Sequence, residues 1–178
     1  LDGVTGVQTC ALPISFDASG PAGTLRVGDV EVGVVSFASN DYLGLTQHPA
    51  VKAAAHEAID RWGTGSGAAR LIVGSRPGHG ELEQALAEWR GTDAAVLFPT
   101  GFAANLGVLA TFGTVGATIC SDERNHASII DGTRLARAEV AIYRHADVDD
   151  LGRALTEAGR ERPDGRTIVV TDTVFSMD

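Results

Sequence analysis

Residues 98–102 read F-P-T-G-F and separate an apolar run from a stretch with helical periodicity. The apolar run, A-A-V-L-F at 94–98, predicts a buried strand, and residues 102–112 predict a helix. A helix that starts after a strand and a glycine turn has free N–H groups at the positive end of its dipole, which favour an anion. Gly101 would let the backbone approach a phosphate, and the Thr100 hydroxyl would add a hydrogen bond. The alternative is an ordinary turn between a strand and a helix.

Downstream of this junction, short apolar runs alternate with helical patterns of about ten residues. The expected strands are 94–98, 117–120, 139–143 and 167–171, and the expected helices are 102–112, 126–137 and 147–158. This alternation predicts an α/β fold, a three-layer α/β/α arrangement around a mostly parallel sheet. Ligands of such sheets bind beyond the carboxyl ends of the strands, which is where residues 99–101, 122–126 and 173–178 are expected to lie.

The upstream part of the chain has a different pattern. Residues 24–27 and 31–37 predict a hairpin, and Pro49 begins a helix expected to run to Trp62. Residues 63–80 are glycine-rich and lack periodicity, which predicts a long loop, and a second helix is expected at 81–90. The G-x-G-x-G in this loop follows a helix rather than a strand, so its context argues against a dinucleotide-binding domain.

Three segments are expected from these patterns. Residues 1–20 show neither periodicity and are interpreted as a non-native or disordered leader. Residues 21–48 form the hairpin and a link, and residues 49–178 form part of a large domain. Because the pattern stops directly after a strand, without the helix that would cover it, we expect a truncated product.

Composition narrows the class of protein. The chain has 178 residues, 44% of them hydrophobic, and a formal net charge of −9, which argues against nucleic acid or an anionic membrane as a partner. No apolar run approaches the ~18 residues of a membrane helix. The two cysteines, Cys10 and Cys120, are far apart and favour a reducing, cytoplasmic setting, with Cys120 buried. No His or Cys spacing suggests a metal site.

Two side chains near the expected edge carry possible chemistry. His126 precedes a helix, where an imidazole could stack on a flat ring or act as an acid or base; a helix-capping or surface histidine is the alternative. Ser176 follows the last strand, and its hydroxyl could bond a cofactor oxygen or simply form a turn. No role is assigned to Asp172 or His79.

Six motifs in order resemble the α-oxoamine synthase family, which are pyridoxal 5'-phosphate (PLP) enzymes with the large domain of the aspartate-aminotransferase fold, fold type I. The resemblance covers roughly residues 24–178. The motifs are FASNDYLGL (37–45), GSGAARLIVG (65–74), HGELEQALAEW (79–89), FPTGFAANLGVL (98–109), SDERNHASIIDGTRLA (121–136) and VTDTVFSMD (170–178).

The resemblance implies a reaction and roles for residues. Within the family, the motifs are most similar to the biotin-pathway member, a homodimer that condenses L-alanine with a pimeloyl thioester, on coenzyme A or acyl carrier protein, and releases carbon dioxide. Thr100 lies beside Gly101 and Phe102, which would hold the cofactor phosphate. His126 would stack on the pyridine ring and contact the substrate. Ser176 would bond the phenolic oxygen, and Asn40 would approach the amino-acid carboxylate. The loop at 65–74 would border the acyl entrance across a dimer interface.

The chain also departs from the family pattern. The family resemblance implies that the C-terminal half and the small domain are the missing parts. The lysine that carries the cofactor lies downstream in the family, and Lys52, the single lysine here, lies too early to replace it. We therefore expect an enzyme at full length and no turnover from these 178 residues. Glycine C-acetyltransferase, 5-aminolevulinate synthase and serine palmitoyltransferase remain alternatives within the family. A non-catalytic subunit with the PLP-enzyme fold remains an alternative outside it.

Overall fold

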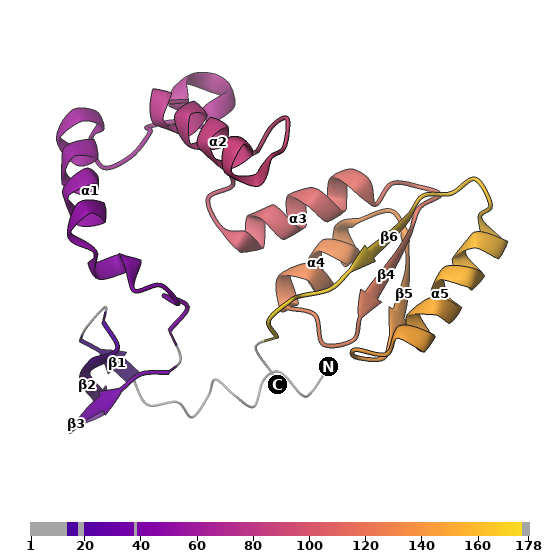
Figure 1. Cartoon of the computed structure of the whole chain (residues 1–178), viewed down its shortest axis with the longest axis horizontal. Coiled ribbons are helices and arrows are strands. Elements are labelled where there is room, and N and C mark those ends of the chain that lie inside the picture. Colours follow the sequence, from indigo (N-terminus) through magenta and orange to yellow (C-terminus); the bar gives the residue numbers. More distant parts are fainter. Residues whose placement is uncertain (1–13, 18–19, 38, 176–178) are drawn as a thin grey trace. The chain divides into compact units, whose positions relative to one another are not determined.

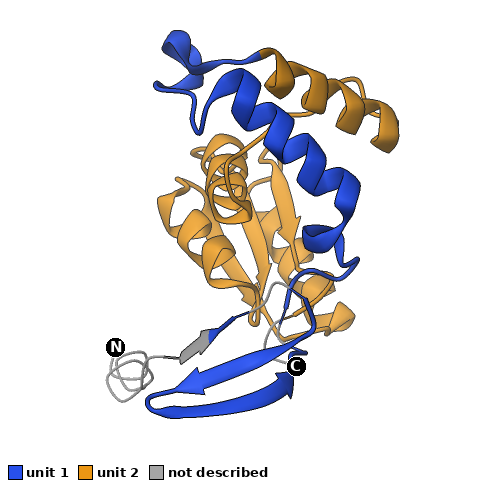
Figure 2. Cartoon of the chain, turned by 90° about the vertical axis from the view of Figure 1, so that its left-hand side faces the viewer, with its two compact units in different colours: residues 1–76 blue, residues 77–178 orange. Residues whose placement is uncertain are grey.

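The computed structural model describes residues 14–17, 20–37 and 39–175. The chain divides into two compact units, Leu1–Arg76 and Pro77–Asp178, which Figure 2 distinguishes by colour.

Unit 1 begins with a three-stranded antiparallel sheet of order β1-β2-β3. The strands are β1 (Ile14–Phe16), β2 (Ala22–Val27) and β3 (Val30–Val35). Val27 pairs with Val30 across a two-residue turn, and the positive φ of 61° at Gly28 is the conformation that such tight hairpin turns require. The predicted hairpin is confirmed, whereas no strand was predicted at β1.

The helices of unit 1 follow a 3-10 turn, η1 (Leu45–Gln47). The helix α1 (Pro49–Trp62) has the predicted bounds. Pro49 occupies the first turn, where a missing N–H costs nothing, and the His48 ring Nδ1 accepts a hydrogen bond from the Ala50 N–H at 3.2 Å. His48 therefore caps α1.

The glycine-rich segment is more structured than predicted. Residues Arg70–Gly74 form a single π-helical turn, η2, and α2 (Pro77–Arg90) begins four residues before the expected start at 81. A side chain at Gly74 would place its Cβ 1.8 Å from the Ala68 carbonyl oxygen, so this turn closes only around glycine. The prediction of one irregular loop over 63–80 was wrong because local backbone hydrogen bonds form the turn η2 within this segment.

Unit 2 is built on a parallel sheet of order β5-β4-β6. Figure 1 shows α3 and α4 on one face of this sheet and α5 on the other, so the predicted α/β/α layering is confirmed. The strands are β4 (Thr118–Asp122), β5 (Glu139–Tyr143) and β6 (Thr167–Val170), and the helices that cover them are α3 (Gly101–Phe112), α4 (Ala127–Leu135) and α5 (Val148–Glu161).

The core of unit 2 lies between the central strand and the helices α3 and α4. Leu109, Ile119 and Ile129 form its buried cluster, and Ile168 and Val170 pack against it from β6. Successive strand residues face opposite sides of a sheet, so Cys120, which has no exposed surface, faces the α5 layer. Burial raises the pKa of the Cys120 thiol, and the expectation of a buried cysteine is confirmed.

The predicted strand at 94–98 does not form. The parallel sheet contains β5, β4 and β6, and residues 94–98 pair with none of these strands. The Leu97 N–H instead donates to Glu83 Oε1 at 2.8 Å. The Phe98 ring folds back onto α3, where a Cβ at Gly107 would lie 2.7 Å from it. An extended segment therefore leads into α3 in place of a strand.

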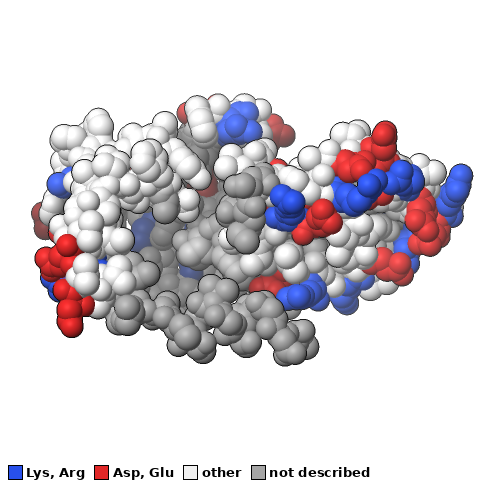
Figure 3. Space-filling model, turned by 90° about the horizontal axis from the view of Figure 1, so that it is seen from below, with Lys and Arg blue, Asp and Glu red and all other residues white. Residues whose placement is uncertain are grey.

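Charges of both signs are mixed over the outer surface of unit 2. Figure 3 shows acidic and basic side chains side by side over the part of this unit that contains α5. Arg144, for example, pairs with Asp147 at 2.6 Å at the start of that helix. Among the described residues, no helix is both long and apolar enough to cross a bilayer.

Candidate functional site

The start of α3 presents unpaired backbone donors. Thr100 is its N-cap, and the Thr100 Oγ1 accepts a hydrogen bond from the Ala103 N–H at 3.0 Å. Within the described part of the chain, the N–H groups of Gly101 and Phe102 have no acceptor. A Cβ at Gly101 would meet no atom within 4 Å, and Gly101 and Phe102 are both exposed, so this end of the helix is accessible. The helix start has the donors and the positive dipole end that an anion needs.

His126 lies at the start of the neighbouring helix. It is the N-cap of α4, and its ring Nδ1 accepts from the Ser128 N–H at 3.1 Å. His126 therefore caps a helix, which was one of the two roles expected from the sequence. This cap engages only one ring nitrogen, and His126 remains exposed, so the cap leaves the rest of the imidazole open to a ligand.

A buried amide, which the sequence did not single out, fixes the turn before His126. Asn125 is 4% exposed, and its Nδ2 donates to Ser121 Oγ and to the Val170 carbonyl, both at 2.9 Å. Its Oδ1 accepts from the Asp172 N–H at 3.0 Å, and Asp172 Oδ2 accepts from the His126 N–H at 2.8 Å. Asp172, left without a role above, thus holds the backbone of His126. The one feature of the sequence that could have indicated this arrangement was the asparagine directly before the histidine.

A buried carboxylate, Asp122, organises the loop after β4. Asp122 accepts from the Arg124 N–H at 2.9 Å, from the Ala146 N–H at 3.1 Å and from His145 Nδ1 at 3.0 Å. Burial alone would raise the pKa of Asp122, but these hydrogen bonds to its charged form outweigh burial and lower the pKa. The His145 ring packs edge-on against Phe175, with ring centroids 4.5 Å apart.

These groups gather at one edge of the parallel sheet. Figure 1 shows that α3 and α4 begin on the side where the strands of unit 2 end, and the side chains of Asn105 and Ser128 join the two helices at 2.9 Å. Thr100, Gly101, Phe102 and His126 are therefore brought to one region, as the topology predicted.

The remaining predicted residues lie elsewhere in the chain. Asn40 belongs to unit 1, where its Oδ1 accepts from the Tyr42 hydroxyl at 3.4 Å. Ser176 lies outside the described residues, and His79 lies in the first turn of α2. In the described ranges, no group of three His, Cys, Asp or Glu residues could hold a metal ion.

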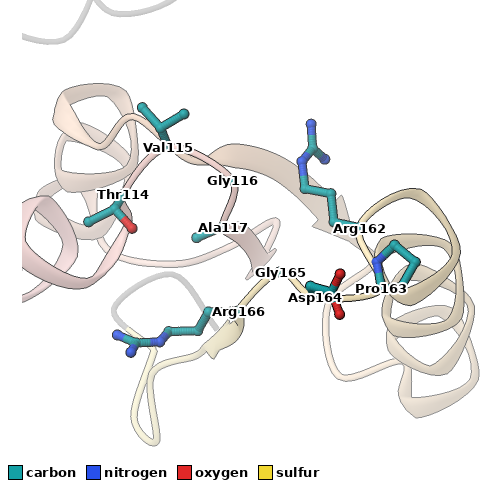
Figure 4. Close-up of a pocket in the computed structure, with 9 residues that line it drawn as sticks. All are labelled: Thr114, Val115, Gly116, Ala117, Arg162, Pro163, Asp164, Gly165 and Arg166. Atoms are coloured by element: carbon teal, nitrogen blue, oxygen red, sulfur yellow. The ribbon is translucent and has the colours of Figure 1, made fainter.

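A hollow of about 660 Å³ lies at the opposite end of the sheet, where the strands begin. Figure 4 shows its lining, Thr114–Ala117 and Arg162–Arg166, which precede β4 and β6 rather than follow them. The guanidinium groups of Arg162 and Arg166 point in different directions (Figure 4), and Arg162 pairs with Glu139. The charged groups that line this hollow therefore do not converge on one ligand.

A chain with this architecture matches a known protein family. The family "aminotransferase class I and II" matches residues 32–178, which is most of the chain. The chain belongs to the aminotransferase class I and II family. PLP is the cofactor of this family.

Curated relatives in the family share about half of the aligned residues. The 8-amino-7-oxononanoate synthase of Thermoanaerobacter pseudethanolicus is 50% identical over 145 residues, which are 82% of this chain and 36% of that protein. The enzyme of the same name from Anaeromyxobacter sp. is 48% identical over 161 residues, 89% of this chain and 39% of that protein. The chain therefore spans little more than a third of the relatives it matches. The resemblance to α-oxoamine synthases is confirmed.

Solved structures of this family have the same fold. Serine palmitoyltransferase from Sphingomonas wittichii superposes with a TM-score of 0.82 at 35% identity, over 92% of this chain and 40% of that chain. The 8-amino-7-oxononanoate synthase of Francisella tularensis gives a TM-score of 0.58 at 29% identity, over 78% of this chain and 37% of that chain. The fold prediction, an α/β large domain of fold type I, is confirmed.

Proposed function

We propose that the complete protein containing this chain is an 8-amino-7-oxononanoate synthase. It would condense L-alanine with a pimeloyl thioester, on coenzyme A or acyl carrier protein, and release carbon dioxide. The observation that carries the proposal is the identity of 48–50% with enzymes of that name across 82–89% of the chain.

The start of α3 fits the phosphate of PLP. Two exposed residues, Gly101 and Phe102, have N–H groups without an acceptor among the described residues, at the positive end of a helix of 12 residues. The Thr100 hydroxyl oxygen accepts from Ala103, so its own hydrogen remains available to donate to a phosphate oxygen. Bound PLP supplies the electron sink for a carbanion at the amino acid, and the protein supplies orientation and electrostatics.

The other site residues have complementary roles in this proposal. His126 would stack on the pyridine ring, because its backbone is held by Asp172 and its Nδ1 is held by α4. Asn40 would contact the amino-acid carboxylate, and Ser176 would donate to the phenolic oxygen. A cytoplasmic homodimer with the active site at its interface belongs to the same proposal.

Serine palmitoyltransferase is the second candidate, favoured by the TM-score of 0.82 of its structures. Purified complete protein with PLP should form the aminoketone from L-alanine and pimeloyl thioester. It should form little or none from L-serine and palmitoyl thioester. The reverse preference would establish the second candidate, and PLP binding without either product would favour the non-catalytic subunit.

A charge at the helix start tests the phosphate site. Gly101→Asp places a carboxylate where the phosphate would bind, and repulsion should weaken PLP affinity at least about tenfold. An acidic residue in the first turn stabilises a helix, so folding should not suffer. Fluorescence titration with PLP measures the affinity, and Gly78→Asp in the first turn of α2 is the control, since a Cβ there also meets no atom within 4 Å. Equal affinity of both variants would remove α3 from the phosphate site.

A further inference from the structure

The His126 imidazole is connected to α3 through two side chains. Its Nδ1 lies 2.6 Å from Ser128 Oγ and accepts from the Ser128 N–H at 3.1 Å. The same Ser128 Oγ accepts from Asn105 Nδ2 at 2.9 Å. Ser128 is 1% exposed, so water does not compete for its hydroxyl.

The directions of these bonds decide where the ring proton lies. A backbone N–H can only donate, so Nδ1 must present a lone pair to it. Because the Asn105 amide donates to Ser128 Oγ, the serine hydroxyl is free to donate its own hydrogen to Nδ1. Two donors therefore point at Nδ1, and a neutral ring must carry its proton on Nε2.

We propose that Ser128 and Asn105 are positioning residues that hold His126 as the Nε2–H tautomer. The Nε2 atom makes no hydrogen bond with the described residues, so the ring presents one fixed donor to the site. Asn105 lies in the same helix as Gly101 and Phe102, so the relay attaches His126 to the helix whose start forms the proposed phosphate site. The value of this donor for catalysis rests on the proposed function, whereas the tautomer itself does not.

Nitrogen NMR of the complete protein measures the tautomer without cofactor or substrate. Histidine labelled with ¹⁵N gives separate shifts for a protonated and an unprotonated ring nitrogen, and the loss of signals in His126→Asn assigns this ring among the histidines of the protein. When the His126 ring is neutral, we expect its Nδ1 to be unprotonated and its Nε2 to be protonated. An Nδ1–H tautomer would overturn the proposal even if the synthase activity were present.

Variants test the relay itself. Ser128→Ala keeps the backbone donor and removes the hydroxyl, and it should shift the tautomer ratio about fivefold toward Nδ1–H, the effect of one ordinary hydrogen bond. Asn105→Ala should act in the same direction, and the double variant should differ little from either one, because both act through one hydroxyl. Thr133→Ala is the control, since it removes a buried hydroxyl of α4 that, among the described residues, bonds only the Ile130 carbonyl, at 2.7 Å.

Activity provides the second readout. If the proposed function holds, kcat/KM for L-alanine should fall about fivefold in Ser128→Ala and stay unchanged in Thr133→Ala. Ser128→Ala and Asn105→Ala spectra that match Thr133→Ala would overturn the relay. If Ser128→Ala fails to fold, the wild-type tautomer and Asn105→Ala still decide the matter. A confirmed tautomer in a protein without synthase activity would refute only the proposed function.

Discussion

Asp122 is the buried carboxylate on which the loops after β4 and β5 depend. Its folded pKa is lowered, so the stabilisation it provides is present above its unfolded pKa of about 3.9 and is lost as the pH falls through the folded value. Asp122→Asn replaces this acceptor by an amide whose NH₂ group faces donors. It should lower the free energy of unfolding by about 2–3 kcal/mol at pH 7 and by less near pH 3. Urea denaturation at both pH values measures the difference.

Asp131→Asn is the matched control at this scale. Asp131 lies on α4, and its carboxylate is 44% exposed and, within the described part of the chain, pairs only with Arg134, at 2.9 Å. Its removal should therefore change stability by about 0–1 kcal/mol. A loss in Asp122→Asn that was no larger than in Asp131→Asn would show that the hydrogen bonds of Asp122 are not what holds these loops.

At the scale of elements, the sequence predicts best where the signal is local. Pro49 and the apolar period place α1 at its observed residues, and β5 also has its predicted bounds. The strand expected at 94–98 does not form because a strand requires a partner strand, and these residues pair with none of the three strands of the sheet in unit 2, which no local pattern encodes. The π-turn at 70–74 is missed because glycine-rich composition resembles a loop.

The candidate site shows the same division between local and distant information. Thr100, Gly101 and His126 could be found because caps and glycine turns are local signals. The role of Asn125 and Asp172 could not be found, because it consists of hydrogen bonds between residues 46 or 47 positions apart. Such contacts exist only once the β4–β6 pairing has formed.

The close approach of α3 and α4, which joins the two helix starts of the site, depends on Gly132. A Cβ there would lie 2.7 Å from Leu109 Cδ1 and 3.2 Å from the Asn105 carbonyl oxygen. Leu109 is 3% exposed and has little room to move. Gly132→Ala should therefore destabilise the protein by about 1–2 kcal/mol, in spite of alanine's better helix propensity. Thermal or urea unfolding measures this change.

Gly152→Ala, on α5, should have the opposite effect on stability. A Cβ at Gly152 would meet no atom within 4 Å, so only the propensity gain remains, and stability should rise by about 0.5–1 kcal/mol. If both substitutions stabilised the protein, the helices α3 and α4 would have to be less tightly packed than the structure shows.

At the scale of the whole molecule, the two units differ in how much they bury. All the buried hydrophobic residues found among the described residues lie in unit 2. In unit 1, the turn η2 exposes Leu71, Ile72 and Val73 at 92%, 73% and 70%, and no residue of α1 is buried. The secondary structure of unit 1 therefore rests on local bonds, whereas that of unit 2 rests on a core.

Hydrogen exchange of the 178-residue chain tests this contrast. An isolated helix of 14 residues is marginal in water, so the α1 amides should exchange within about tenfold of the unfolded rate. The amides of the buried strand β4 open only with unit 2 and should exchange at least about 1000-fold more slowly. Equal protection of α1 and β4 would mean that unit 1 acquires a covering surface that its own residues do not provide. If neither were protected, the core around Ile119 would be too small to hold unit 2 together.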